Sequence, residues 1–101
     1  MLEQITHDAF AQQLNTPFRV QSNHDRSLTV ELIEATGLHT SDRCEAFSIV
    51  FRGPADPFLP QGTYRFDHDE IGAFELFIVP IRQDERGLYY EACFNRLRQG
   101  E

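Results

Sequence analysis

Apolar residues recur at every second position along most of the chain after residue 17, a pattern typical of short β-strands. The clearest case is residues 47–52, where Phe47, Ile49 and Phe51 share one parity. Because successive side chains of a strand point to opposite faces, these three residues are expected to face one core. Further strands are expected near residues 18–20, 28–32, 64–68, 74–81 and 88–94.

Residues 53–62 connect two of these strands and carry three prolines, Pro54, Pro57 and Pro60. Proline fixes its own φ angle and biases the preceding residue toward extended conformations. It also lacks the N–H group that a sheet ladder needs. The segment is therefore predicted to be a stiff loop, called the proline loop below.

A short helix is expected near residues 6–14, before the first strand. Thr6 can cap it, and Phe10 and Leu14 lie one turn apart on one face. Six short antiparallel strands with one terminal helix predict a single all-β domain over residues 1–101, with strands from about 18 to 97. A small six-stranded antiparallel barrel fits this pattern best, and a two-sheet sandwich is the alternative. The side chains expected to meet in its core are Phe47, Ile49, Phe51, Phe66, Leu76, Ile78, Tyr90 and Phe94.

The strand near 74–81 is apolar on both faces, because Phe77, Val79 and Ile81 have the parity opposite to the core residues. We expect the N-terminal helix or the opposite barrel wall to cover this second face, and the alternative is a partner protein. Pro80 cannot donate to a ladder, so it is expected at an edge, a strand end or a bulge.

Composition narrows the classes of function. The 101 residues are 41% hydrophobic, which suits one domain with one core. Sixteen acidic against nine basic residues give a net charge of −7, which disfavours nucleic-acid binding. No window is apolar enough to cross a membrane, and the N-terminus lacks the pattern of a signal peptide. We therefore expect a soluble, cytoplasmic protein in which Cys44 and Cys93 are reduced, with their pairing left open.

Candidate chemistry is sparse. Residues 67–70 contain His68 between two aspartates, and His24 and Asp25 could add ligands. Adjacent strand residues point to opposite faces, however, so these groups do not converge on a metal ion. The glycines are spaced as turn residues, and no nucleophile has a recognisable catalytic setting. The sequence thus predicts neither a metal, nor a cofactor, nor catalytic residues, and it does not predict an enzyme.

Four segments resemble a small bacterial family described as domain of unknown function 6916. They are FSIVFRGP, LPQGTYRF, LFIVPI and YYEACFNR, and the resemblance extends over Leu14 to Arg96. The family has no assigned activity, so the resemblance implies no catalytic residue. Its members are often encoded beside proteins with phage-tail-collar domains. The resemblance therefore implies a role with a fibre-like or tail-like β-rich partner.

The proline loop is the candidate partner-binding site. Phe58 and Leu59 could serve as apolar anchors, while Arg52, Gln61 and Arg96 could supply directional hydrogen bonds, with Asn95 completing a polar cluster if two strand ends meet. The alternative is structural: an internal polar cluster, with Phe58 and Leu59 folded inward as a lid.

Two functions remain open at this stage, with an enzyme held in reserve. We favour a non-enzymatic protein-interaction or assembly module, with homo-oligomerisation left open. The alternative is a small-ligand-binding β barrel, whose cavity nine phenylalanines and three tyrosines could line.

Overall fold

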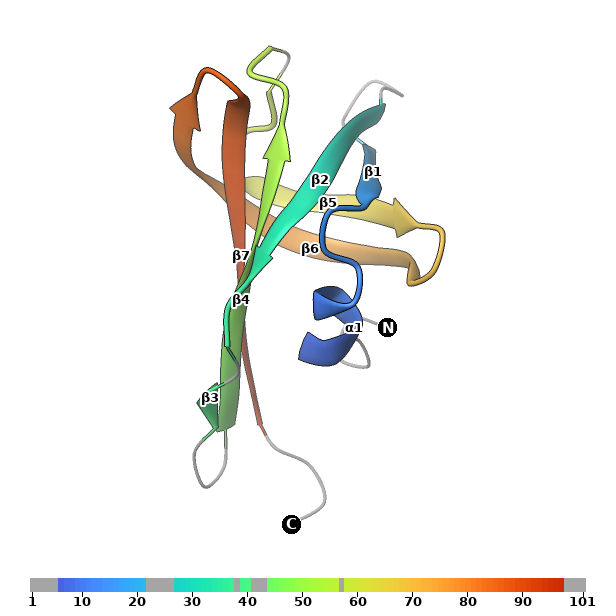
Figure 1. The fold of residues 1–101 in the computed structure, drawn as a ribbon, viewed down its shortest axis with the longest axis vertical. Helices are drawn as coiled ribbons and strands as arrows, with labels where there is room; N and C mark the ends of the chain where they lie inside the picture. The colour runs from blue at the N-terminus through green and yellow to red at the C-terminus, as the bar shows by residue number, and fades with distance from the viewer. Residues whose placement is uncertain (1–5, 22–26, 38, 41–43, 57, 98–101) are drawn as a thin grey trace.

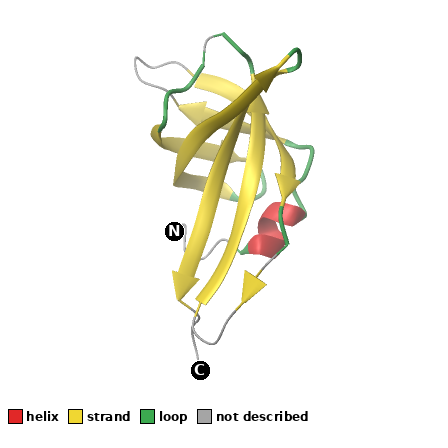
Figure 2. Ribbon diagram, turned by 90° about the vertical axis from the view of Figure 1, so that its left-hand side faces the viewer, coloured by secondary structure: helices red, strands yellow, loops and turns green. Residues whose placement is uncertain are grey.

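The protein folds into one closed antiparallel barrel with a short helix at one end (Figures 1 and 2). The structure, a computed structural model, describes residues 6–21, 27–37, 39–40, 44–56 and 58–97. Its elements are α1 (His7–Ala11), β1 (Pro17–Gln21), β2 (Ser27–Ala35), β3 (His39–Thr40), β4 (Cys44–Gly53), β5 (Gly62–His68), β6 (Gly72–Asp84) and β7 (Gly87–Leu97).

Strand pairing closes the barrel. The strands follow the order β2-β1-β5-β6-β7-β4, and β4 pairs again with β2. Every pair is antiparallel. The all-β prediction and the six-stranded barrel are confirmed, and the two-sheet sandwich is not adopted. The two-residue strand β3 adds to the edge of β4, and the sequence pattern did not predict it.

One end of the barrel is splayed, and α1 fills it. The pairing of β6 with β7 begins only at Val79, while the first half of β6 pairs with β5 and the second half of β7 pairs with β4 alone, because the β4 pairing runs from Leu88 to Leu97. Phe10 of α1 contacts the rings of Phe47, Phe74 and Phe94 at centroid distances of 6.4, 5.9 and 5.4 Å. Figure 1 shows α1 beside β4 and beneath β6. The helix therefore acts as a plug for this end.

The interior is filled with aromatic side chains. All eight residues that the sequence assigned to the core are buried in one cluster, which confirms that prediction. Phe47 stacks on its register partner Phe94 of the adjacent strand at 4.5 Å, and Phe51 lies 5.1 Å from Phe66 on the opposite side of the barrel. Aromatic pairs at these separations stabilise a core beyond the area that they bury.

The helix is shorter than expected. Its predicted cap is confirmed, because the Thr6 hydroxyl accepts a hydrogen bond from the Ala9 N–H at 3.1 Å. The predicted end near Leu14 is wrong. The helix α1 ends at Ala11, and the following turn places Leu14 against the core. Asn15 then adopts a positive φ of 66° and donates its N–H to the Leu32 carbonyl, so the helix cannot continue.

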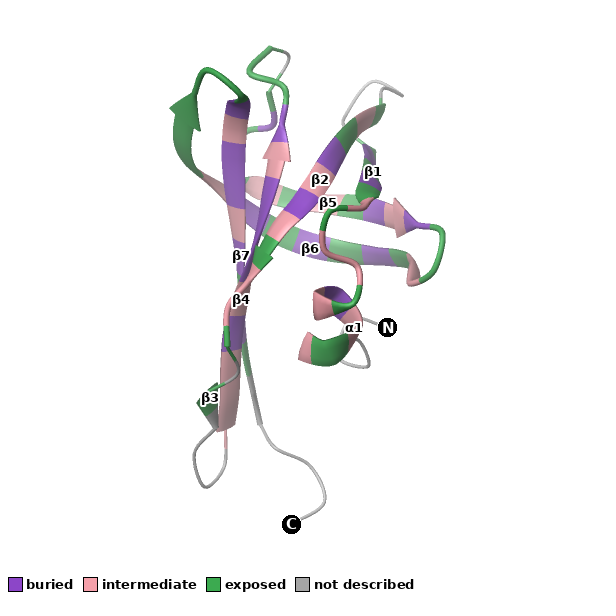
Figure 3. Cartoon of the chain, viewed as in Figure 1, coloured by how far each residue is buried: buried purple, intermediate pink, exposed green. Residues whose placement is uncertain are grey.

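The outward face of β6 stays exposed, as the alternating burial along this strand in Figure 3 indicates. Phe77 is 51% exposed and Ile81 is 44% exposed. The expected internal cover is therefore wrong, because α1 is too short to lie along β6 and directs Phe10 into the barrel end instead. Pro80 lies at an irregularity before Arg82, beyond the last β6 residue that pairs with β5, which confirms the expected bulge or edge position.

Gly87 gives a prediction about the β6–β7 turn. Its φ is +142°, and a Cβ built there would collide with the Gly53 carbonyl oxygen. We expect Gly87→Ala to lower the free energy of unfolding by at least about 1–3 kcal/mol, the usual cost of a strained backbone position. Gly37→Ala is the matched control, because nothing lies within 4 Å of its Cβ position and its φ is ordinary. Urea denaturation of both variants tests this, and equal stabilities would contradict it.

Candidate functional site

The proline loop is fastened to the barrel by Leu59. This side chain is only 1% exposed and belongs to the core cluster. Its N–H donates a hydrogen bond of 2.9 Å to the Tyr90 hydroxyl, which is itself buried. Burial raises the pKa of Tyr90, so the hydroxyl stays neutral near pH 7. Leu59 therefore points inward, as in the alternative in which it forms part of a lid on the barrel end.

Phe58 points the other way. It is 55% exposed, the largest exposed fraction among the large hydrophobic residues that the structure describes. The next turn of chain is also held, because the Tyr64 hydroxyl donates to the Pro60 carbonyl at 2.7 Å. Gln61 is exposed beside it. The loop thus presents Phe58 outward immediately before two fixed points, Leu59 and Pro60, while Pro57 lies outside the described residues.

Arg52 forms an ion pair with a residue of the neighbouring strand β2. Its Nη2 lies 2.6 Å from Oε1 of Glu31, directly across the β2–β4 pair. The pair is partly buried, so solvent screens it less than a fully exposed pair. Arg52 therefore serves first to join β4 to β2.

The expected polar cluster of Arg52, Gln61, Asn95 and Arg96 is wrong. In the antiparallel β4–β7 pair, the end of β4 meets the start of β7, so Arg52 lies opposite Tyr89. Arg96 lies opposite Glu45, seven residues of β4 away. At the usual rise per residue this separation is roughly 24 Å. Neither Asn95 nor Arg96 can share a site with the proline loop.

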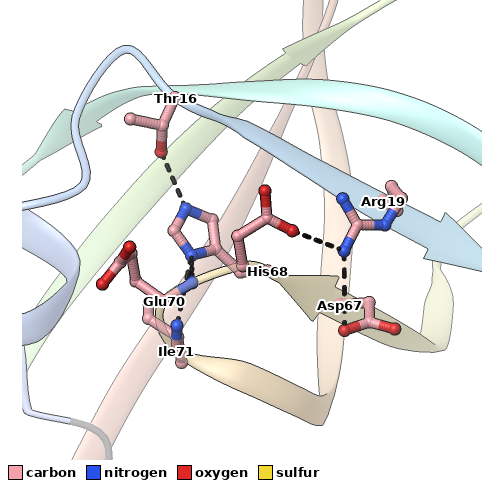
Figure 4. Close-up of polar contacts among 7 residues, drawn as sticks. Thr16, Arg19, Asp67, His68, Glu70 and Ile71 are labelled. Carbon is pink, nitrogen blue, oxygen red and sulfur yellow. Dashed lines mark hydrogen bonds and ion pairs between the residues drawn. The ribbon is translucent and has the colours of Figure 1, made fainter.

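A second group of polar contacts surrounds His68 at the end of β5 (Figure 4). His68 is 4% exposed, and its Nδ1 accepts hydrogen bonds from the backbone N–H groups of Glu70 and Ile71 at 3.0 and 3.2 Å. Nδ1 therefore carries no proton, and Nε2–H donates to the Thr16 hydroxyl at 2.9 Å. Thr16 donates in turn to the Gln13 carbonyl at 2.6 Å.

The charged residues around His68 lie on the outside of the barrel. Arg19 is 3.1 Å from Asp69 and 3.8 Å from Asp67, and all three are well exposed. Exposed pairs of this kind contribute little to stability. Burial lowers the pKa of His68, although Asp69 and Glu70 oppose that shift. The predicted placement of His68 and the aspartates on opposite faces is confirmed, and the structure shows that His68 takes the inward face.

The two cysteines are too far apart to pair. Cys44 lies opposite Leu97, and Cys93 lies opposite Ser48, four residues further along β4. The separation is roughly 14 Å along the strand, twice the limit for a disulfide. Burial and the nearby Glu91 raise the pKa of Cys93, so its thiol is less reactive than an ordinary one.

Among residues 6–21, 27–37, 39–40, 44–56 and 58–97, no three His, Cys, Asp or Glu side chains gather as metal ligands would. Within the same ranges, no helix has the length and apolar character needed to cross a bilayer.

This geometry defines a small closed antiparallel β barrel with a helical plug and a fastened proline loop. The chain belongs to the family described as Domain of unknown function (DUF6916), whose model matches residues 5–94. The resemblance found in the sequence is thereby confirmed. Searches of curated proteins and of solved structures found no match.

Proposed function

We propose that the protein is a non-enzymatic interaction module that docks a protein partner through the proline loop. The observation that carries this proposal is the opposite orientation of two neighbouring residues. Leu59 is fixed in the core while Phe58 is exposed. An aromatic side chain that is exposed on a fastened loop is a good anchor for a partner pocket, because few loop conformations are lost when it binds.

The barrel interior supports an interaction module over a ligand-binding barrel. Seven phenylalanine rings from α1 and five strands contact one another within the core. A ligand-binding barrel instead keeps a cavity between its walls. The packed rings favour recognition on the outer surface.

The partner we propose is a β-rich, fibre-like or tail-like protein in the cytoplasm. This identity comes from the family resemblance and its association with tail-collar proteins. The surface adds one physical constraint, because a chain with a net charge of −7 associates faster with a neutral or basic partner surface. Gln61, exposed beside Phe58, is suited to a hydrogen bond at the rim of such an interface.

Separate substitutions of the two loop residues test the proposal. Phe58→Ser is expected to leave the free energy of unfolding within about 0.5 kcal/mol of the parent and to abolish partner recovery. Leu59→Ser is expected to cost at least about 2–5 kcal/mol, because it removes core volume and buries a hydroxyl. Thermal unfolding and quantitative recovery from native host lysate are measured for each variant.

Phe77→Ser is the matched control for exposure, because Phe77 is another half-exposed phenylalanine on a different surface. It should keep both stability and partner recovery. Full recovery with Phe58→Ser at unchanged stability would contradict the proposal, as would equal losses with Phe77→Ser.

A further inference from the structure

Two histidines hold the plug helix α1 at its two ends. At the start, Nε2–H of His7 donates to the Thr36 carbonyl at 2.5 Å. Beyond the end of α1, His68 donates to Thr16, whose hydroxyl donates to the Gln13 carbonyl. We call His68, Thr16 and the Gln13 carbonyl the His68 latch. These hydrogen bonds join α1 and its following turn to Thr36 and to β5. The same turn is also joined to β2, because the Asn15 N–H donates to the Leu32 carbonyl and the Leu32 N–H donates to the Thr16 carbonyl.

The two histidines respond differently to a proton. A protonated His7 still donates Nε2–H to the Thr36 carbonyl, and its Nδ1–H faces the Asp8 carboxylate at 3.7 Å. A protonated His68 would point an N–H group at two other N–H donors, those of Glu70 and Ile71. Protonation is therefore compatible with the His7 contact and incompatible with the present position of the His68 ring.

The charges near His68 come from three parts of the chain. Arg19 belongs to β1, Asp67 belongs to β5, and Asp69 and Glu70 belong to the β5–β6 turn. The charged side chains of α1, His7 and Asp8, lie at the other end of that helix. Asp69 and Glu70 favour protonation, Arg19 disfavours it, and burial disfavours it most, so the net pKa is lowered.

We propose that the His68 latch is a proton-controlled device that releases the C-terminal end of α1 and opens the plugged end of the barrel. The neutral ring joins the turn after β5 to Thr16 and Gln13. The protonated ring must turn away from Glu70 and Ile71, and the bond to Thr16 is then lost with it. Since Phe10 enters the barrel from α1, loosening this end exposes the rings that Phe10 covers.

The sign of the effect follows from the lowered pKa. The unfolded or opened chain binds a proton with the ordinary His pKa of 6.5, whereas the latched state binds it only at lower pH. The latch therefore contributes its full stability above pH 6.5 and loses it as the pH falls through the folded-state pKa. Opening should increase by up to about tenfold per pH unit between pH 6.5 and the folded-state pKa, and should level off below that pKa.

Amide hydrogen exchange, read residue by residue by NMR at pH 7.5 and pH 5, tests the proposal. After correction for the intrinsic exchange rate, residues 10–14 and the amides of Glu70 and Ile71 should lose protection at pH 5, while β4 and β7 keep theirs. Uniform loss of protection across the whole barrel would overturn the proposal, as would unchanged protection in α1.

His68→Asn is the test variant, because its amide oxygen can accept from the Glu70 and Ile71 N–H groups and it does not titrate. The pH dependence of α1 protection should disappear in this variant and persist in His39→Gln, the control at an exposed histidine. The same pH dependence in His68→Asn would overturn the proposal. If His68→Asn does not fold, the ¹⁵N shifts of the His68 ring in the parent protein decide: a titration that does not coincide with the loss of α1 protection overturns it.

Discussion

Phe51→Ala is expected to lower the free energy of unfolding by about 3–5 kcal/mol, a large part of the total for a domain of this size. Phe51 is almost fully buried on β4, and its ring contacts Phe18 at 5.2 Å and Phe66 at 5.1 Å. Truncation leaves a cavity between strands on opposite sides of the barrel, which cannot collapse because pairing closes the sheet. Urea denaturation with a two-state fit measures the change.

Phe77→Ala is the control for this substitution, since it removes the same atoms from an exposed position on β6. It should change the stability by no more than about 0.5 kcal/mol. A loss below about 1 kcal/mol in Phe51→Ala, or similar losses in both variants, would mean that β4 does not pack as described.

Phe10→Ala is expected to have the second large effect, again about 3–5 kcal/mol. A helix of five residues has no stability of its own, so α1 depends on the contacts of Phe10 with Phe47, Phe74 and Phe94. Without this ring, α1 should detach as well, and its amides should lose exchange protection ahead of the strands. Calorimetry measures the loss of stability, and hydrogen exchange measures the loss of protection in α1.

Phe10→Leu is the control that distinguishes the loss of the aromatic ring from the loss of any apolar side chain at this position. It refills most of the volume and should cost less than about 1.5 kcal/mol while keeping α1 protected. If Phe10→Ala costs as little as Phe10→Leu, the plug does not hold the barrel end together.

The barrel was predictable because most of its strands alternate between one apolar and one polar face. Alternation at Phe47, Ile49 and Phe51 sets the strand and its inward face without reference to the rest of the fold. The cap at Thr6 is equally local. The early end of α1 was not predictable, because it depends on Asn15 donating to Leu32, a contact between distant parts of the sequence.

The proline loop shows where sequence reasoning stops. Phe58 and Leu59 are equally apolar, and a loop has no period that distinguishes inside from outside. The contacts that hold Leu59 inward, its packing in the core and its N–H bond to Tyr90, join distant parts of the sequence. The prediction that Arg96 could lie near Arg52 was wrong for a simpler reason. Antiparallel pairing places Arg96 beside the other end of β4.

His68 was correctly placed on the face opposite the aspartates, but its structural role was not recognised. The signal was present: an inward polar residue at a strand end is followed by a tight turn whose N–H groups need acceptors. Its partner Thr16 lies 52 residues earlier in the sequence, and no local pattern links the two.

Site-specific photo-crosslinking tests the central claim, that Phe58 is the anchor for a protein partner, most directly. A benzophenone-bearing phenylalanine analogue replaces Phe58 in one variant and Phe77 in another, and both are irradiated in native host lysate. The account predicts one discrete adduct at position 58, suppressed by excess parent protein but not by excess Phe58→Ser protein, and no such adduct at position 77. An adduct only at position 77, no adduct at either position, or equal suppression by Phe58→Ser protein would contradict it.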